Sequence, residues 1–62
     1  MNWTPNGDGE WIDDTGRYKI GRWQWANGKL TYDLIGVASR EVLGEYPSFL
    51  AAEYAATHDF AG

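Results

Sequence analysis

Apolar and polar residues alternate along two stretches in the middle of the chain, and an Asn-Gly pair separates the stretches. The first covers residues 17–26 and the second covers residues 29–37. An Asn-Gly pair between two runs rich in aromatic and branched residues is the strongest short-range signal of a β-hairpin. The pattern therefore predicts two long antiparallel strands with a tight turn at Asn27 and Gly28.

The number of residues in this turn decides which strand residues face each other. A two-residue type I′ turn is favoured because it gives two sensible pairs across the hairpin, Trp23–Tyr32 and Arg22–Asp33. It makes both faces of the hairpin apolar, one with Trp23, Trp25, Leu30, Tyr32 and Leu34, the other with Tyr18, Ile20, Ile35 and Val37. The alternative is a three-residue loop, 26–28, with Gly28 in a left-handed bulge. It places Ile20 opposite Leu34 and reverses the faces of the last strand.

A short strand, Glu10–Asp13, is predicted before the hairpin. Asp14-Thr15-Gly16 makes a tight connection to the hairpin, with its glycine at positive φ. A loop of this length sets Ile12 opposite Tyr18 and places Trp11 on the face that carries the other tryptophans.

Two segments lack a periodic pattern. Residues 1–9 are dense in turn-forming residues and are predicted to be an irregular arm with Trp3 as its one large anchor. Residues 38–48 are predicted to be a loop with a short extended piece, in which Val42 or Leu43 reaches the core.

One helix is predicted at the end of the chain. Pro47 disfavours helical geometry in the residue before it, and Ser48 can cap the orphan amides of a helix that covers residues 49–59. One stripe of this helix has alanines that let it lie close to a sheet: Phe49, Ala52, Ala55 and Ala56, with Phe60 as an optional last member. A second stripe, about 100° away, consists of Leu50, Tyr54 and His58.

These elements predict a single α+β domain over residues 1–62. A three-stranded antiparallel β-meander covers residues 10–37, and the C-terminal helix packs on it. A sheet with two apolar faces cannot have both faces covered by one short helix. Apolar surface therefore remains on the uncovered sheet face or on the stripe of Leu50, Tyr54 and His58, and such patches mark protein interfaces.

Composition supports a small domain that depends on its aromatic residues. A domain of 62 residues buries only about 60% of the surface that its unfolded chain exposes. The chain has no cysteine for disulfides or thiolate metal sites, and its four tryptophans and four tyrosines are the expected substitute. No apolar run approaches the roughly 20 residues that span a bilayer, and the N-terminus lacks the regions of a signal peptide, so we expect a cytoplasmic protein without membrane contact.

Charge argues against a general nucleic-acid binder. Nine acidic and five basic residues give a formal charge of −4, which opposes binding to phosphates. The signs are segregated: Arg17, Lys19, Arg22 and Lys29 lie on the hairpin, and Asp8, Glu10, Asp13 and Asp14 precede it.

Neither a metal centre nor an active site is expected, and no cofactor. Oxygen ligands crowd the acidic segment, but their spacing does not match the EF-hand loop, in which a glycine would replace Trp11. His58 and Asp59 are neighbours on a helix and point in different directions, so they do not form an acid/base pair. His58 fits a favourable position near the helix C-terminus.

We expect the chain to bind a protein through an aromatic patch rimmed by carboxylates that meet basic residues of the partner. The expected contact residues are Asp8, Glu10, Trp11, Asp13, Asp14, Leu50, Tyr54 and His58. The alternative is a nucleic-acid-binding hairpin that uses Arg17, Lys19, Arg22, Trp23, Trp25 and Lys29. A third alternative is a structural subunit that forms homo-oligomers through the uncovered sheet face or an edge strand.

Small bacteriophage accessory proteins resemble this chain in three segments, Tyr18-Lys19-Ile20, Tyr32-Asp33-Leu34 and Leu43-Gly44-Glu45-Tyr46-Pro47-Ser48, and in the later Ala52, Ala55, Ala56 and His58. The layout of residues 10–60 is also similar to the integrase arm-binding domain, whose sheet enters the DNA major groove. Tiny acidic phage proteins are often inhibitors of host defence, including anti-CRISPR proteins. The resemblance therefore implies a protein of the host cytoplasm that inhibits a host defence complex such as CRISPR-Cas by steric occlusion or charge mimicry.

Overall fold

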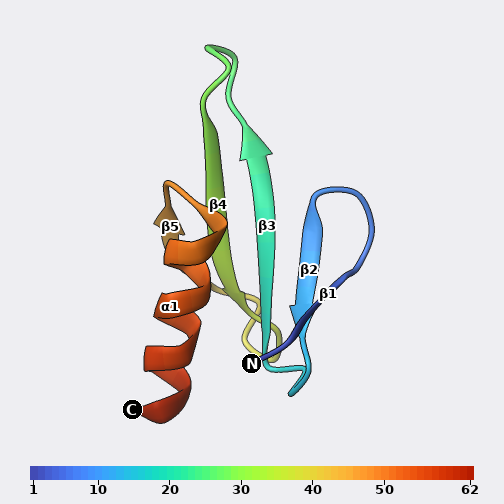
Figure 1. The fold of residues 1–62 in the computed structure, drawn as a ribbon, viewed down its shortest axis with the longest axis vertical. Helices are drawn as coiled ribbons and strands as arrows, with labels where there is room; N and C mark the ends of the chain where they lie inside the picture. Colours follow the sequence, from blue (N-terminus) through green and yellow to red (C-terminus); the bar gives the residue numbers. More distant parts are fainter.

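The computed structural model describes residues 1–62 and contains one antiparallel sheet and one helix. The elements are β1 (Trp3–Pro5), β2 (Glu10–Asp13), β3 (Tyr18–Gln24), β4 (Leu30–Gly36), β5 (Val42–Tyr46) and α1 (Phe49–Ala61). The five strands lie in the order β1-β2-β3-β4-β5, each antiparallel to the next (Figure 1). The predicted α+β class with a C-terminal helix on an antiparallel sheet is confirmed, but the prediction of three strands is wrong.

The first additional strand lies in the segment predicted to be an irregular arm. Trp3–Pro5 pairs with β2, with Trp3 opposite Asp13 and Pro5 opposite Trp11. A proline belongs at the edge of a sheet, because its missing N–H then removes no bond to a further strand. The turn-forming residues that hid this strand form its loop to β2.

The second additional strand, β5, lies in the segment predicted to be a loop. Leu34 faces Gly44 and Ile35 faces Val42, so Leu43 is the extra residue of a β-bulge. A bulge shifts the alternation of side chains by one residue. For this reason the segment shows no period of two in the sequence although it forms a strand.

The β3–β4 hairpin has the three-residue loop, and the favoured two-residue turn is wrong. The Trp25 amide donates to the Lys29 carbonyl at 2.8 Å, and the Gly28 amide donates to the Trp25 carbonyl at 2.9 Å. Gly28 has φ 85°, whereas Asn27 does not have positive φ. A type I′ turn requires positive φ at both central residues, so this loop is a turn followed by a left-handed bulge.

Burial explains why this register forms. Ile20 and Leu34 face each other and are 0% and 1% exposed. The two-residue turn would place them on opposite faces, because a shift of one residue turns a whole strand over. The predicted Arg22–Asp33 and Trp23–Tyr32 pairs do not form, since Arg22 faces Tyr32 and Asp33 faces Gly21.

The β2–β3 connection is also longer than predicted. Ile12 faces Lys19 instead of Tyr18, and Trp11 faces Ile20. Trp11 therefore lies on the core face of the sheet and does not join the other strand tryptophans. The positive φ of Gly16, at 74°, is confirmed.

Helix α1 covers one face of the sheet, on the side of β4 and β5 in Figure 1. Its alanines allow close approach, and the buried core consists of Tyr18, Ile20, Leu34, Ala52 and Ala56. Phe49 extends this core toward β1 and β2 through edge contacts with three rings: Trp11 at 5.0 Å, Trp3 at 6.1 Å and Tyr32 at 6.3 Å between centroids. Aromatic residues thus complete a core that contains only two large buried aliphatic side chains.

The predicted helix start is confirmed. The Ser48 hydroxyl accepts a hydrogen bond from the Ala51 amide at 3.1 Å, in the geometry of an N-cap. The helix ends at Ala61, two residues later than predicted, and the Gly62 amide donates to the His58 carbonyl at 3.0 Å.

The opposite face of the sheet, called the outer face below, has no element packed on it. The strand register places these residues there: Glu10, Ile12, Lys19, Gly21, Trp23, Thr31, Asp33, Ile35, Val42 and Glu45. The prediction that apolar surface remains uncovered is confirmed, since Trp23 is 58% exposed.

The left-handed bulge requires a positive φ at position 28, and this requirement can be tested by substitution. A Cβ at Gly28 would meet no atom within 4 Å, so any cost of a side chain there comes from the backbone conformation. We expect Gly28→Ala to lower the free energy of unfolding by about 1 to 2 kcal/mol, and Gly28→Asn to cost less because Asn tolerates positive φ. Urea denaturation measures both variants. Equal stability of the Ala variant and the wild type would contradict the bulge.

Candidate functional site

Two tryptophans stand exposed at the hairpin end of the outer face. Trp23 and Trp25, called the tryptophan pair below, are 58% and 45% exposed. The hairpin that carries them extends beyond the helix and the other strands (Figure 1). About half of the surface of each residue is therefore accessible to a partner.

The tryptophan pair has a fixed geometry despite its exposure. The two rings meet edge to face, with centroids 6.3 Å apart and an interplanar angle of 77°. The indole N–H of Trp25 donates to the hydroxyl of Thr31 at 2.9 Å. Thr31 faces Trp23 across the strands and is only 4% exposed. The residue that accepts the Trp25 hydrogen bond is therefore itself held in place by its surroundings. A partner would meet aromatic surface that needs little ordering.

Carboxylates form the next row of the outer face. Glu10 faces Gly21, Gly21 faces Asp33, and Asp33 faces Glu45, so one line across four strands holds three acids and one glycine. We call these four residues the acidic row. Lys19 contacts Glu10 at 3.3 Å, and this is the one ion pair within 4.0 Å in the structure.

The acidic residues predicted to form one contact surface are not brought together. Asp8 and Asp14 are exposed in the loops at the two ends of β2. Glu10 lies between them on the outer face and binds both Lys19 and the amide of Asn6, the latter at 3.1 Å. Asp8 and Asp14 are close in sequence, but β2 lies between them and keeps them apart.

Asp13 has a structural position instead of a contact position. It is 3% exposed, and its carboxylate accepts hydrogen bonds from the Tyr18 amide at 2.8 Å and from the amide and hydroxyl of Thr15. Burial by itself raises the pKa of this carboxyl, but the hydrogen bonds from Thr15, Tyr18 and Arg17 outweigh burial, and the pKa lies below its ordinary value of 3.8. Asp13 therefore stabilises the β2–β3 connection.

Trp11, also predicted as a contact residue, lies in the aromatic part of the core. It is half-buried against Phe49 and approaches Tyr32, with ring centroids 6.5 Å apart. Its position follows from the β2–β3 register.

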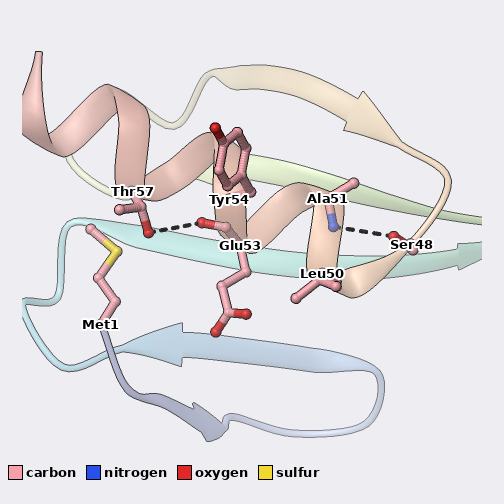
Figure 2. A pocket seen from close by; sticks show the side chains of 7 residues that line it. All are labelled: Met1, Ser48, Leu50, Ala51, Glu53, Tyr54 and Thr57. Carbon is pink, nitrogen blue, oxygen red and sulfur yellow. Dashed lines mark hydrogen bonds between the residues drawn. The ribbon is translucent and has the colours of Figure 1, made fainter.

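The predicted helix stripe is exposed. Leu50 and Tyr54 are 72% and 66% exposed, and the Tyr54 ring packs 4.6 Å from His58. Beside this stripe an open groove of about 610 Å³ lies between α1 and the N-terminal residue, with Met1 across from Glu53 and Thr57 (Figure 2). The stripe and groove face away from the outer face, so the protein has two separate apolar surfaces.

His58 and Asp59 have different neighbours. The Asp59 carboxylate accepts a hydrogen bond from the Tyr18 hydroxyl, and this bond, together with burial, raises the pKa of Tyr18 above its ordinary value. His58 instead packs on Tyr54. Asp59 thus ties the end of the helix to the start of β3.

The basic residues of the hairpin are dispersed. Arg17 lies over the Phe60 ring, 5.1 Å from its centroid, and Arg22 is on the core side of the sheet opposite Tyr32. Lys29 is at the hairpin tip. Lys19 shares the outer face with the tryptophan pair, but it is paired with Glu10.

Comparisons of this chain with protein-family models, with curated proteins and with solved structures give no match. The single helix lacks the length and apolar character that are needed to cross a membrane. No group of three His, Cys, Asp or Glu residues is arranged to hold a metal ion.

Sequence reasoning missed Thr31, Asp33 and Glu45 as members of the surface. The alternative three-residue loop aligns Gly21 with Asp33 and turns Thr31 and Asp33 to the face of Trp23, so the sequence did offer a register that predicts these two residues. Glu45 depends on β5 and its bulge, which have no periodic signature.

The buried carboxylate of Asp13 makes stability depend on pH. Its pKa is lower in the folded protein than in the unfolded chain, so its contribution is complete above about pH 4 and is lost as the pH falls through the folded value. We expect Asp13→Asn to lower the free energy of unfolding at pH 7 by about 1 to 3 kcal/mol and to flatten its decline in acid.

Asp14→Asn is the matched control, because Asp14 is adjacent and exposed, and we expect it to stay within about 0.5 kcal/mol of the wild type. Thermal unfolding of both variants, measured at about ten pH values between about pH 2 and pH 7, gives the stability of each variant as a function of pH. Indistinguishable profiles for the two variants would contradict the structural position of Asp13.

Proposed function

We propose that this protein is a non-enzymatic binding protein that docks a partner protein on its outer face, with Trp23 and Trp25 as the anchors. The observation that carries the proposal is the fixed but exposed geometry of the tryptophan pair, which the Trp25–Thr31 hydrogen bond and the edge-to-face contact maintain.

Aromatic side chains in fixed positions are suited to binding. Tryptophan buries a large area with few rotatable bonds, and it is enriched among the residues that dominate interface energetics. A side chain that is ordered before binding loses less conformational entropy in the complex. Few large side chains of this protein are buried, yet two tryptophans lie outside the core. Their exposure supports a role in binding instead of a role in stabilising the fold.

The surroundings of the tryptophan pair favour a protein over a nucleic acid. Binding of single strands combines aromatic platforms with a positively charged groove along the backbone. Here the row next to the pair holds three carboxylates, and the one lysine nearby is engaged by Glu10. The formal charge of −4 adds to this repulsion of phosphates.

The helix stripe is a second surface for contact. Leu50 and Tyr54 are the most exposed of the large apolar side chains on α1, and they lie on the other side of the molecule. A partner on the outer face leaves them free. They therefore supply a matched control, since their removal takes away comparable apolar area at a distance from the proposed site.

Inhibition of a host defence complex would follow if the partner's own ligand shared the surface that the tryptophan pair occupies. Occlusion requires only that the bound protein cover that surface. The phage and anti-CRISPR assignment rests on the resemblance described for the sequence, and it stays a prediction.

Affinity capture from bacterial lysate tests the proposal with three forms of the tagged protein: the wild type, Trp23→Ala/Trp25→Ala and Leu50→Ala/Tyr54→Ala. We expect the wild type and the helix variant to retain the same protein in stoichiometric amount. The tryptophan variant should bind it at least about 30-fold more weakly, since central anchors contribute about 2 kcal/mol or more.

Circular dichroism checks that both double variants remain folded, as the exposure of all four side chains leads us to expect. Loss of capture in the helix variant alone, or capture of nucleic acid without protein, would contradict the proposed function.

A further inference from the structure

We propose that the partner segment on the outer face is basic, and that an arginine of this segment docks over Gly21 between the Trp23 ring and the carboxylate of Asp33. This inference rests on the proposed function, and it names the chemistry of the same site. The outer face has three rows in sequence along the strands: the tryptophan pair, the acidic row, and an aliphatic row with Ile12, Lys19, Ile35 and Val42.

Gly21 makes a notch in the middle of the acidic row. A Cβ at this position would meet only the Cδ1 atom of Ile35, at 3.7 Å, so the space above the glycine is open toward the outer side. Trp23 is two residues away on the same strand and face, and Asp33 lies directly opposite. Ile35 thus borders the notch directly, and the strand register places one aromatic and one acidic residue as the next neighbours of Gly21 on the same face.

The charges around the notch are not balanced within the molecule. Asp33 and Glu45 face each other on adjacent strands, an arrangement in which like charges repel. Neither has an ion-pair partner, because the single ion pair joins Lys19 to Glu10. The Oδ1 atom of Asp33 is buried and receives no hydrogen bond. Arg40, the other cation near this face, lies beyond the aliphatic row with Lys19.

A guanidinium fits these requirements better than other cations. It stacks on aromatic faces and still presents several N–H donors in one plane, which a lysine ammonium does less well. The oxygens open to these donors are Oδ2 of Asp33 and the carboxylate of Glu45, since Oδ1 of Asp33 is buried. Adjacent strands are about 4.8 Å apart, so the acids spread along a line instead of converging on one point. No three of the protein's acids are arranged around a metal ion.

Charge also excludes the other occupants of such a face. A second copy would bring the same acidic row and the same charge of −4 to the contact. A nucleic acid would bring phosphates to three carboxylates. A basic extended segment brings the opposite charge, and electrostatic complementarity of this kind raises the association rate and selects the partner.

Hexa-arginine, hexa-lysine and a single-stranded oligonucleotide are the probes for this inference, titrated against the full chain by calorimetry at low and at physiological salt. We expect hexa-arginine to bind, hexa-lysine to bind at least about 5-fold more weakly, and the oligonucleotide not to bind. Amide shifts on hexa-arginine binding should centre on Gly21, Trp23, Asp33 and Glu45.

Matched variants separate a specific site from general attraction. Asp33→Asn/Glu45→Gln and Asp8→Asn/Asp14→Asn change the net charge equally, but only the first pair alters the acidic row. We expect the row variant to lose at least about 10-fold in affinity for hexa-arginine and the loop variant less than about 2-fold. The row variant should melt at or above the wild-type temperature, because it removes a repulsion.

Equal losses in the two variants, equal affinity for the two peptides, no binding of hexa-arginine, or binding of the oligonucleotide would each overturn the inference. The proposed function fails separately. If the tryptophan variant loses the captured partner and the row variant keeps it, the outer face is the docking surface but its occupant is not basic.

Discussion

The contact between Ile20 and Leu34 is the constraint on which the rest of this structure depends. They are the two largest side chains that are fully buried, and they lie side by side opposite Ala52 and Ala56 of the helix. No other large side chain of this 62-residue protein is fully buried, so the core cannot lose either of them from this face. Once they share a face, the one-residue shift of the hairpin is excluded, and the side of every other residue in β3 and β4 follows.

The same constraint generates the functional surface. Placing Ile20 and Leu34 inward places Trp23, Thr31 and Asp33 outward, on a face that no helix covers. Local rules are broken there: tryptophans are exposed, like charges face each other, and a buried carboxylate oxygen lacks a donor. Natural sequences violate such rules mainly where function requires it, and these three violations share the outer face, whereas the exposed Leu50 and Tyr54 and the unpaired indole N–H of Trp3 lie elsewhere.

Local signals in the sequence predicted the parts of the fold that depend on neighbouring residues. The Ser48 cap, the bounds of the strand at Glu10–Asp13 and the positive φ of Gly16 each follow from short-range chemistry. The edge strands were missed because β1 is three residues long with a proline and β5 contains a bulge. The predicted hairpin register was wrong because it was based on favourable cross-strand pairs such as Arg22 with Asp33. Burial of Ile20 and Leu34 on one face, which the pairs do not reveal, favours the other register.

The site was also predictable only in part, because some of its features depend on one element and others on the pairing of several strands. Exposure of Leu50 and Tyr54 follows from helical spacing within one element, and the sequence indicated it. The acidic row is made by four strands, so its members have no sequence pattern in common. Asp8 and Asp14, which looked like one cluster with Glu10 and Asp13, are separated by the strand that lies between them.

Interstrand nuclear Overhauser effects across the hairpin test the central claim most directly. The Trp25–Lys29 hydrogen bond sets the alternation of the ladder, so residues that face each other without hydrogen bonds bring their Hα atoms closest. The account predicts Hα–Hα contacts between Ile20 and Leu34 and between Arg22 and Tyr32. Contacts between Gly21 and Leu34 and between Trp23 and Tyr32 would contradict it, because the outer face would then hold different residues.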